Sequence, residues 1–185
     1  FTGQEAHSGI NPEDGHSAIA AAAGAVSRME LGRLDDETTA NVGVIEGGTA
    51  SNVVAGRCRI LGEARSIDGT RAAALVGEMV DACSTGASDH GCDADVKVLE
   101  MFRGYRNDPE SPAVRAAGRA LDRCGFKPSH VATGGGSDAN ALMAKGYDCV
   151  LLANGTTANH TPQEAVAGAA MTGMLAVLDA VVEEC

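Results

Sequence analysis

Aromatic residues are almost missing from this sequence. Of its 185 residues, 3% are aromatic and none is tryptophan, although 44% are hydrophobic. The hydrophobic core is therefore expected to consist of aliphatic side chains and many small residues, among them part of the 24 glycines. The length allows one medium-sized domain or two small ones.

Positive charge is scarce as well. Lys and Arg together number 14 against 25 Asp and Glu, which gives a formal net charge of −11. Nucleic-acid binding requires positive side chains that displace counterions from phosphates, so no nucleic acid is expected as a partner. Phosphate-rich membrane surfaces are disfavoured for the same reason. The sequence also lacks a run of about 20 apolar residues, which a membrane-spanning helix needs.

Cysteine pairs of the Cys-x-x-Cys type are absent too. The six cysteines lie scattered in apolar segments, at positions 58, 83, 92, 124, 149 and 185. A chain of this length does not depend on disulfides for its stability, and no signal peptide or basic leader is recognisable. We therefore expect reduced thiols in the core of a cytoplasmic protein.

Strand-like and helix-like patterns alternate in the first 102 residues. The predicted elements are a strand over 1–7, a helix over 17–31, strands over 38–48 and 51–66, a helix over 69–85 capped by Asp68, and a strand over 92–102. This β-α-β-β-α-β order predicts a ferredoxin-like α+β fold. Such a fold has a four-stranded antiparallel sheet with two helices on one face.

A change of composition at residues 103–112 marks a domain boundary after residue 102. The elements predicted beyond it are a helix over 112–124, a strand over 128–132, a helix over 139–145, a strand over 147–153 and a helix over 162–183. This alternation is typical of a parallel α/β layer. Because two strands do not complete such a sheet, we interpret residues 103–185 as a partial α/β domain.

Several polar motifs carry residues that catalysis or binding could use. His7 ends a strand before Ser-Gly, Asn52 lies at a hairpin turn, and Arg65 ends a long strand. His160 follows an apolar strand and precedes a helix, which is a typical place for a catalytic group or metal ligand. Taken singly, His7 and Arg65 are best explained as surface residues and Asn52 as a turn residue, and one His binds no metal ion tightly.

A glycine-rich loop, Thr-Gly-Gly-Gly-Ser-Asp-Ala-Asn at 133–140, stands between a predicted strand and helix. Its glycines let backbone N–H groups approach an anion or a carbonyl oxygen. The lysine and the spacing of a nucleotide phosphate loop are missing. By itself the motif is best explained as a tight turn with Ser137 or Asp138 as the helix cap.

Together, and in this order, the motifs are more specific. They are G-x-x-x-H-S-G at 3–9, N-P-x-x-G-x-x-A-I at 11–19, N-x-G-x-I-x-G-G at 41–48, S-N-V-V at 51–54, G-E-A-R-S-x-D at 62–68, T-G-G-G-S-D-A-N at 133–140 and H-T-x-x-E at 160–164. This series resembles the two-zinc metallopeptidase family of peptidase T, glutamate carboxypeptidase, aminoacylase and succinyl-diaminopimelate desuccinylase. It is most similar to the peptidase T-like tripeptidase branch.

The resemblance implies different roles for the two halves of the chain. Residues 1–102 match the family's ferredoxin-like lid, which dimerises, and residues 103–185 match the end of its catalytic domain. The family's His-x-Asp ligand pair is absent, and the only Glu-Glu, at 183–184, is expected to be a solvated helix end. We therefore expect a C-terminal fragment, beginning inside the first lid strand, that hydrolyses nothing alone and binds no zinc tightly.

The same resemblance implies roles for individual residues of the intact enzyme. His160 matches the last metal ligand of a site for two zinc ions, and His7 matches a residue that reaches the partner subunit's site and stabilises the oxyanion. The residues implied in substrate binding are Asn52, Arg65, Arg106, Gly135, Gly136 and Ser137. The implied reaction is zinc-dependent hydrolysis of amide bonds in small peptides by a homodimer.

Other functions remain open at this point. Within the family, the chain could belong to a carboxypeptidase or to a deacylase of N-acyl amino acids. Outside it, a ferredoxin-like domain could serve as a non-catalytic dimerisation or small-molecule-binding module. A metal-free structural subunit would require His160 to be buried or without a partner.

Overall fold

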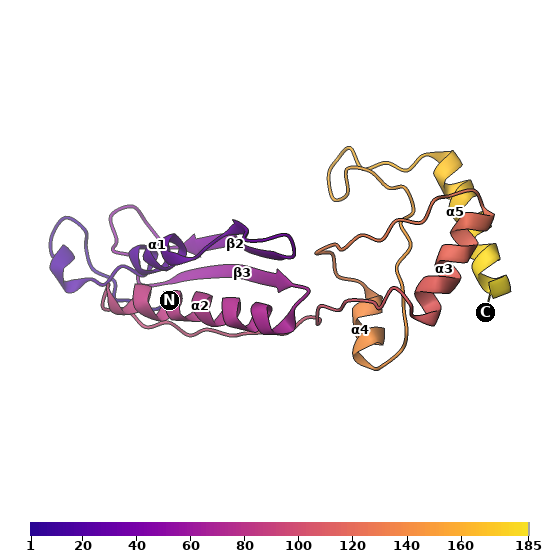
Figure 1. Ribbon diagram of the computed structural model, residues 1–185. Helices are drawn as coiled ribbons and strands as arrows, with labels where there is room; N and C mark the ends of the chain where they lie inside the picture. Colours follow the sequence, from indigo (N-terminus) through magenta and orange to yellow (C-terminus); the bar gives the residue numbers. More distant parts are fainter. Residues whose placement is uncertain (185) are drawn as a thin grey trace. The chain divides into compact units, whose positions relative to one another are not determined.

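The computed structural model describes residues 1–184 and consists of two compact units. Unit 1 comprises Phe1–Gly104, and unit 2 begins at Tyr105. Both are visible in Figure 1. Cys185, which we expected to be a core thiol, lies outside the described residues.

Unit 1 is built on an antiparallel hairpin of two long strands. Strand β2 (Thr38–Gly47) pairs with β3 (Cys58–Ser66), so that Thr38 lies opposite Ser66 and Gly47 opposite Cys58. A short strand, β1 (Gly32–Arg33), pairs with the other edge of β2 near its start. The hairpin confirms the α+β prediction, but β3 begins at residue 58 rather than 51, because residues 48–57 form the connection.

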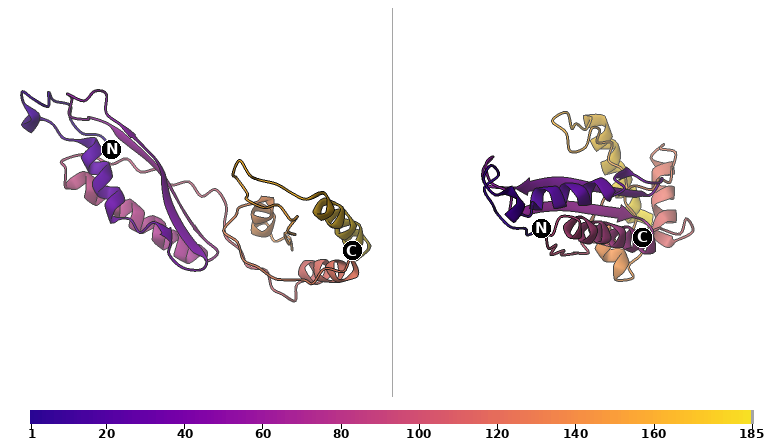
Figure 2. Two further views of the ribbon diagram at one scale, coloured as in Figure 1. Left: turned by 90° about the horizontal axis from the view of Figure 1, so that it is seen from above. Right: turned by 90° about the vertical axis from the view of Figure 1, so that its left-hand side faces the viewer.

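Two helices cover one face of this sheet, as the left view of Figure 2 shows. Helix α1 (Ala18–Arg28) begins at Ser17, whose hydroxyl accepts the N–H of Ala20, and follows a short 3₁₀ helix, η1 (Pro12–Asp14). Helix α2 (Gly69–Ser88) begins at Asp68, whose carboxylate accepts the N–H of Thr70 at 2.8 Å. Both starts match the sequence prediction, since capping side chains mark them.

Small residues make the contact between α1 and α2. Ala21, Ala22 and Ala25 of α1 are completely buried. Gly86 of α2 lies so close that an added Cβ would be 2.6 Å from the Ala21 carbonyl oxygen and 2.7 Å from the Ala25 nitrogen. The scarcity of aromatic residues and the abundance of Ala and Gly therefore correspond to two helices packed at short range.

The predicted four-stranded sheet is not formed within residues 1–184, where the sheet has three strands. The segments predicted as outer strands make isolated pairs, with Thr2 opposite both Arg57 and Asp93. A strand pattern without a neighbouring strand stays extended but unpaired, and Val98, Leu99 and Met101 are exposed accordingly.

Unit 2 contains the helices α3 (Pro112–Arg123), α4 (Asp138–Ala144) and α5 (Gly168–Glu184). The strands predicted over 128–132 and 147–153 are not formed in the described part of the chain. Their apolar residues find no neighbouring strand to pair with, and Val131 and Leu151 are exposed. The last helix begins at Gly168 rather than at 162, because residues 157–165 form a closed loop.

The contact between α3 and α5 combines a small apolar core with ion pairs. Ala120, Val177 and Ala180 form the core. The ion pairs join Arg119 to Glu184 and Arg123 to both Glu183 and Glu184. Residues 183–184 thus end the last helix, as predicted, and Glu183 is exposed, but both glutamates pair with arginines of α3 rather than with solvent alone. The arginines, Arg119 first, lower the pKa of Glu184, and hydrogen bonds to the two glutamates raise the pKa of Arg123.

The five described cysteines are all free. Cys58 and Cys83 are buried, whereas Cys92, Cys124 and Cys149 are half-buried. Burial raises the pKa of the Cys58, Cys83 and Cys92 thiols. No helix formed by residues 1–184 is both long and apolar enough to span a membrane.

Candidate functional site

His7 and Asn52 are brought together by backbone pairing. The segment that carries His7 runs antiparallel to the 52–54 segment, with His7 opposite Val53. The N–H of Ser8 donates to the carbonyl oxygen of Asn52 at 3.0 Å, and the N–H of Val54 donates to that of Ala6 at 2.9 Å. Both candidate side chains are exposed. These two residues of unit 1 therefore share one surface.

The backbone turns sharply directly after His7. The His7 carbonyl oxygen accepts two N–H groups, from Ile10 at 3.2 Å and from Asn11 at 3.1 Å. The N–H of Gly9 turns back to the His7 ring and donates to Nδ1 at 3.1 Å. The ring is thus held by its own turn. Sequence reasoning singled out His7 but missed this contact, although the Ser-Gly that follows permits such a turn.

Arg65 does not join the pair formed by His7 and Asn52. It lies seven residues beyond Cys58 on β3, which corresponds to about 24 Å along an extended strand. Its guanidinium group donates to both carboxylate oxygens of Glu63, at 3.1 and 2.8 Å, and lies 5.9 Å from the centre of the Phe102 ring. Glu63 was missed, although its position two residues away on one strand places both side chains on the same face.

His160 stands on a tightly closed loop of unit 2. Thr157 and Ala165 exchange two backbone hydrogen bonds, at 2.8 and 3.2 Å, which close the loop at its base. The N–H of His160 donates to the Glu164 carboxylate at 2.6 Å. His160 has a φ of 62° and Ala158 a φ of 52°. This left-handed backbone costs a non-glycine residue about 1–3 kcal/mol, and the hydrogen bonds of the loop maintain it. The His160 side chain is exposed.

The glycine-rich loop leads directly into α4. Ser137 caps this helix in a reciprocal arrangement with Asn140: the N–H of Ser137 donates to Asn140 Oδ1 at 2.9 Å, and the Ser137 hydroxyl accepts the N–H of Ala139 at 3.2 Å. Ser137 is therefore a helix cap, as one of the sequence interpretations had it. The predicted part of Gly135, Gly136 and Ser137 in substrate binding stays a prediction, as does that of the exposed Arg106.

The residues described do not form a zinc site by themselves. A catalytic zinc ion takes three protein ligands and a water molecule. Residues 1–184 contain no group of three or more His, Cys, Asp or Glu side chains arranged to hold a metal ion. The His160 ring is exposed, and the described residues make no hydrogen bond to it. A metal-free structural subunit therefore stays an alternative, and the role of His160 as a metal ligand stays a prediction.

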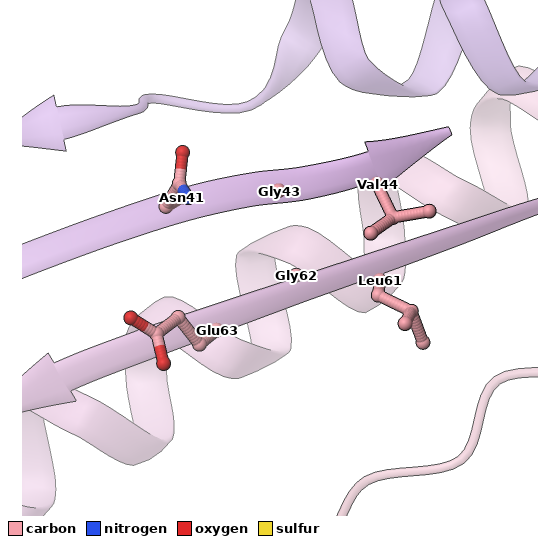
Figure 3. A pocket seen from close by; sticks show the side chains of 6 residues that line it. All are labelled: Asn41, Gly43, Val44, Leu61, Gly62 and Glu63. Carbon is pink, nitrogen blue, oxygen red and sulfur yellow. The ribbon is translucent and has the colours of Figure 1, made fainter. Parts of the chain in front are cut away.

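Two hollows lie on unit 1, and the first reaches Glu63, the partner of Arg65. Figure 3 shows the first, of about 240 Å³, on the β2–β3 hairpin. Asn41, Gly43, Val44, Leu61, Gly62 and Glu63 line it. The second, of about 800 Å³, runs along the start of β3 between Phe1 and Arg59. Neither is lined by a predicted site residue, so the hollows do not mark the site.

Comparison with known proteins shows to which family the first half of the chain belongs. Residues 1–91 match the family described as peptidase dimerisation domain. They belong to this family. For these residues the resemblance drawn from the sequence motifs is thereby confirmed, and we call residues 1–91 the dimerisation domain.

Similarity to known proteins extends over nearly the whole chain. The uncharacterised protein YqjE of Bacillus subtilis is 39% identical over 98% of the chain. The solved structure of aminopeptidase PepT from Bacillus cereus is 40% identical over 99%, with a TM-score of 0.87. That of a tripeptidase from Staphylococcus aureus is 33% identical over 98%, with a TM-score of 0.91. The chain spans about half the length of these relatives, namely 49%, 49% and 48%.

Proposed function

We propose that this chain is part of a zinc-dependent peptidase that hydrolyses amide bonds of small peptides. The observation that carries the proposal is the likeness to an aminopeptidase and a tripeptidase over 99% and 98% of the chain, at 40% and 33% identity. Because the likeness includes unit 2 as well as the dimerisation domain, it favours a catalytic role over a free-standing dimerisation module. The chain alone is proposed to be inactive.

Zinc is the proposed cofactor, with His160 as one ligand. His160 has an exposed imidazole on a closed loop with a left-handed backbone, and backbone strain of this kind is common at functional sites. Residues 1–184 offer no complete set of ligands, so the others are proposed to come from residues of a longer protein. When bound there, the metal would polarise the carbonyl group of the substrate.

His7 is proposed to donate a hydrogen bond to the oxygen of the reacting carbonyl group, with Asn52 beside it. A preorganised donor at such an oxygen is typically worth about 2.7–4 kcal/mol of transition-state stabilisation. The pairing of their backbones makes His7 and Asn52 one unit. Whatever site receives His7 therefore also receives Asn52, whereas Arg65 would bind a substrate carboxylate from the other end of the sheet.

The receiving site is proposed to be that of a second copy of the chain. The outer edge of β2 supports association, because among the residues described β1 and the turn after it cover only its start, at Thr38, Thr39 and Ala40. An open strand edge favours pairing with another chain, and most soluble oligomers have two-fold symmetry. A homodimer through the dimerisation domain would carry His7 and Asn52 of one subunit towards the zinc site of the other.

The test compares a longer protein that contains this chain, at the length of its relatives, with the 185-residue chain alone. We expect the longer protein to cleave tripeptides in the presence of zinc, and the chain alone to cleave none. Preference for N-acyl amino acids would replace the peptidase proposal by the deacylase alternative. A longer protein that dimerises but cleaves neither class would favour the non-catalytic module.

A further inference from the structure

The contact between Gly9 and His7 constrains where the imidazole carries its proton. A neutral imidazole has one N–H donor and one nitrogen that accepts, and the partner of one nitrogen decides the role of the other. Here the N–H of Gly9 donates to Nδ1 at 3.1 Å. A ring nitrogen that accepts a hydrogen bond carries no proton, so the proton lies on Nε2.

The geometry that produces this contact is well supported by the backbone. The His7 carbonyl oxygen accepts the N–H groups of both Ile10 and Asn11, and the N–H of Ser8 is held by the Asn52 carbonyl oxygen. Gly9 itself lies against the ring: the closest atoms to an added Cβ would be His7 Cε1 at 3.7 Å and Nδ1 at 3.8 Å. The amide of Gly9 is therefore fixed beside Nδ1 by hydrogen bonds on both sides of the turn.

We infer that the Gly9 amide is a positioning group, which holds neutral His7 in the tautomer with the proton on Nε2. His7 then presents an N–H donor, suited to an electron-rich oxygen such as the carbonyl oxygen of an amide substrate. The identity of this ligand rests on the proposed function, whereas the tautomer rests only on the contacts of this chain.

The inference also excludes two other roles in this conformation. With Nδ1 engaged by Gly9 and Nε2 protonated, neither ring nitrogen has a lone pair for a metal ion. The neutral ring likewise has no free nitrogen with which to take a proton from water as a general base. His7 and His160 thus differ in kind, since no hydrogen bond of the residues described occupies a ring nitrogen of His160.

Nuclear magnetic resonance of the ¹⁵N-labelled 185-residue chain tests the tautomer directly. At a pH of about 8.5, where imidazole side chains are neutral, we expect a scalar coupling across the hydrogen bond between the Gly9 amide nitrogen and His7 Nδ1. The ring shifts should show the proton on Nε2. An Nδ1–H tautomer, or a tautomer ratio equal to that of exposed His130 without such a coupling, would overturn the inference.

Two variants at position 9 distinguish the effect of the Gly9 N–H on the tautomer from the effect of the shape of the turn. Gly9→Ala keeps the N–H and adds a methyl group at ordinary contact distance from the ring, so the tautomer should not change. Gly9→Pro removes the N–H, and the tautomer ratio should relax by roughly fivefold, the equivalent of a hydrogen bond of about 1 kcal/mol. Should Gly9→Pro not fold, the coupling in the unmodified chain still decides.

Activity of the longer protein then tests what the tautomer is for. Gln places an amide N–H₂ near the position of Nε2, and Asn places one near Nδ1, so His7→Gln should retain at least tenfold more turnover than His7→Asn. If the coupling is found but His7→Ala leaves turnover unchanged, the proposed role of His7 fails and the assignment of the tautomer stands. If the coupling is missing, the inference fails whatever the activity.

Discussion

The two units of this chain differ in how completely they bury their apolar residues. In unit 1 the helices α1 and α2 close over the β2–β3 hairpin, and Leu75, Ala18 and Ala22 are at most 1% exposed. Unit 2 has a small core between α3 and α5. Outside it, large apolar residues face solvent, among them Val131 at 77% and Val182 at 76% exposed.

The difference shows which part of the fold depends only on its own residues. A hairpin and two capped helices cover each other's inner faces, so residues 1–91 have a buried core of small and aliphatic residues, although Ile10 and Ile45 of the same segment are exposed. Unit 2 has little such cover, and Leu151, Met171 and Leu175 are 55%, 60% and 61% exposed. The chain spans about half the length of its relatives, and we propose that another part of a longer protein covers these residues.

The largest expected effect is a difference in amide exchange between the units. We expect backbone amides of α1, α2 and β3 to exchange at least about a hundredfold more slowly than those of α3, α4 and α5. A free energy of local opening that is lower by about 3 kcal/mol in unit 2 produces such a ratio. Hydrogen–deuterium exchange with mass spectrometry measures it in the monomeric chain. Equal protection in both units would remove the basis of the comparison.

The contact of α1 with α2 offers the next largest effect. Gly86→Ala should destabilise unit 1 by about 1–3 kcal/mol, because its Cβ would press on the backbone of α1. The matched control is Gly77→Ala on the same helix, where nothing lies within 4 Å of an added Cβ. It should stabilise the helix by about 0.5–1 kcal/mol. Urea unfolding of both variants checks the signs, and a stabilising Gly86→Ala would contradict the close packing.

Thiol labelling should show a difference of about tenfold in rate between cysteines of the two units. Reaction requires a thiolate and access, and burial raises the pKa of Cys58 and Cys83 in unit 1. We expect iodoacetamide to modify the half-buried Cys124 and Cys149 of unit 2 about tenfold faster. Peptide mapping after timed labelling measures this. Rates that become equal only in denaturant would confirm that folding causes the difference.

Acid should weaken unit 2 slightly more than unit 1. Because Arg119 and Arg123 hold the pKa of Glu184 below its usual value of 4.5, this glutamate stabilises the α3–α5 contact above pH 4.5. That contribution is lost as the pH falls through the lowered pKa. Exchange protection of α5 should fall a few-fold there, while Glu184→Gln, which has no ionisable group, should show no such change. The protection of α1 serves as the internal reference.

The elements that were predicted from the sequence are those with a local signal. Ser17, Asp68 and Ser137 mark helix starts because each caps backbone N–H groups a few residues ahead. The strands over 128–132 and 147–153 failed for a physical reason. A strand is completed by hydrogen bonds to a neighbour, and an apolar pattern does not show whether the neighbour is present.

The candidate site was also predictable from the sequence only in part. Motifs identified His7, Asn52 and His160, and backbone pairing then placed His7 beside Asn52. The pairing of Arg65 with Glu63 and the closed loop under His160 depend on side-chain and loop geometry. Residue order alone does not specify such geometry, because several arrangements of the same short segment satisfy its hydrogen-bond donors.

Subunit mixing tests the central claim, that His7 and Asn52 of one subunit act at the zinc site of the other. Two inactive variants of the longer protein, His7→Ala and His160→Ala, are mixed under conditions of proven subunit exchange. A mixed dimer then contains one site with both residues intact, and activity should partly return. The control pair, His7→Ala with Asn52→Ala, should recover nothing, because every site of that mixed dimer lacks one of the two residues. No recovery in the first pair, or equal recovery in both, would contradict the account.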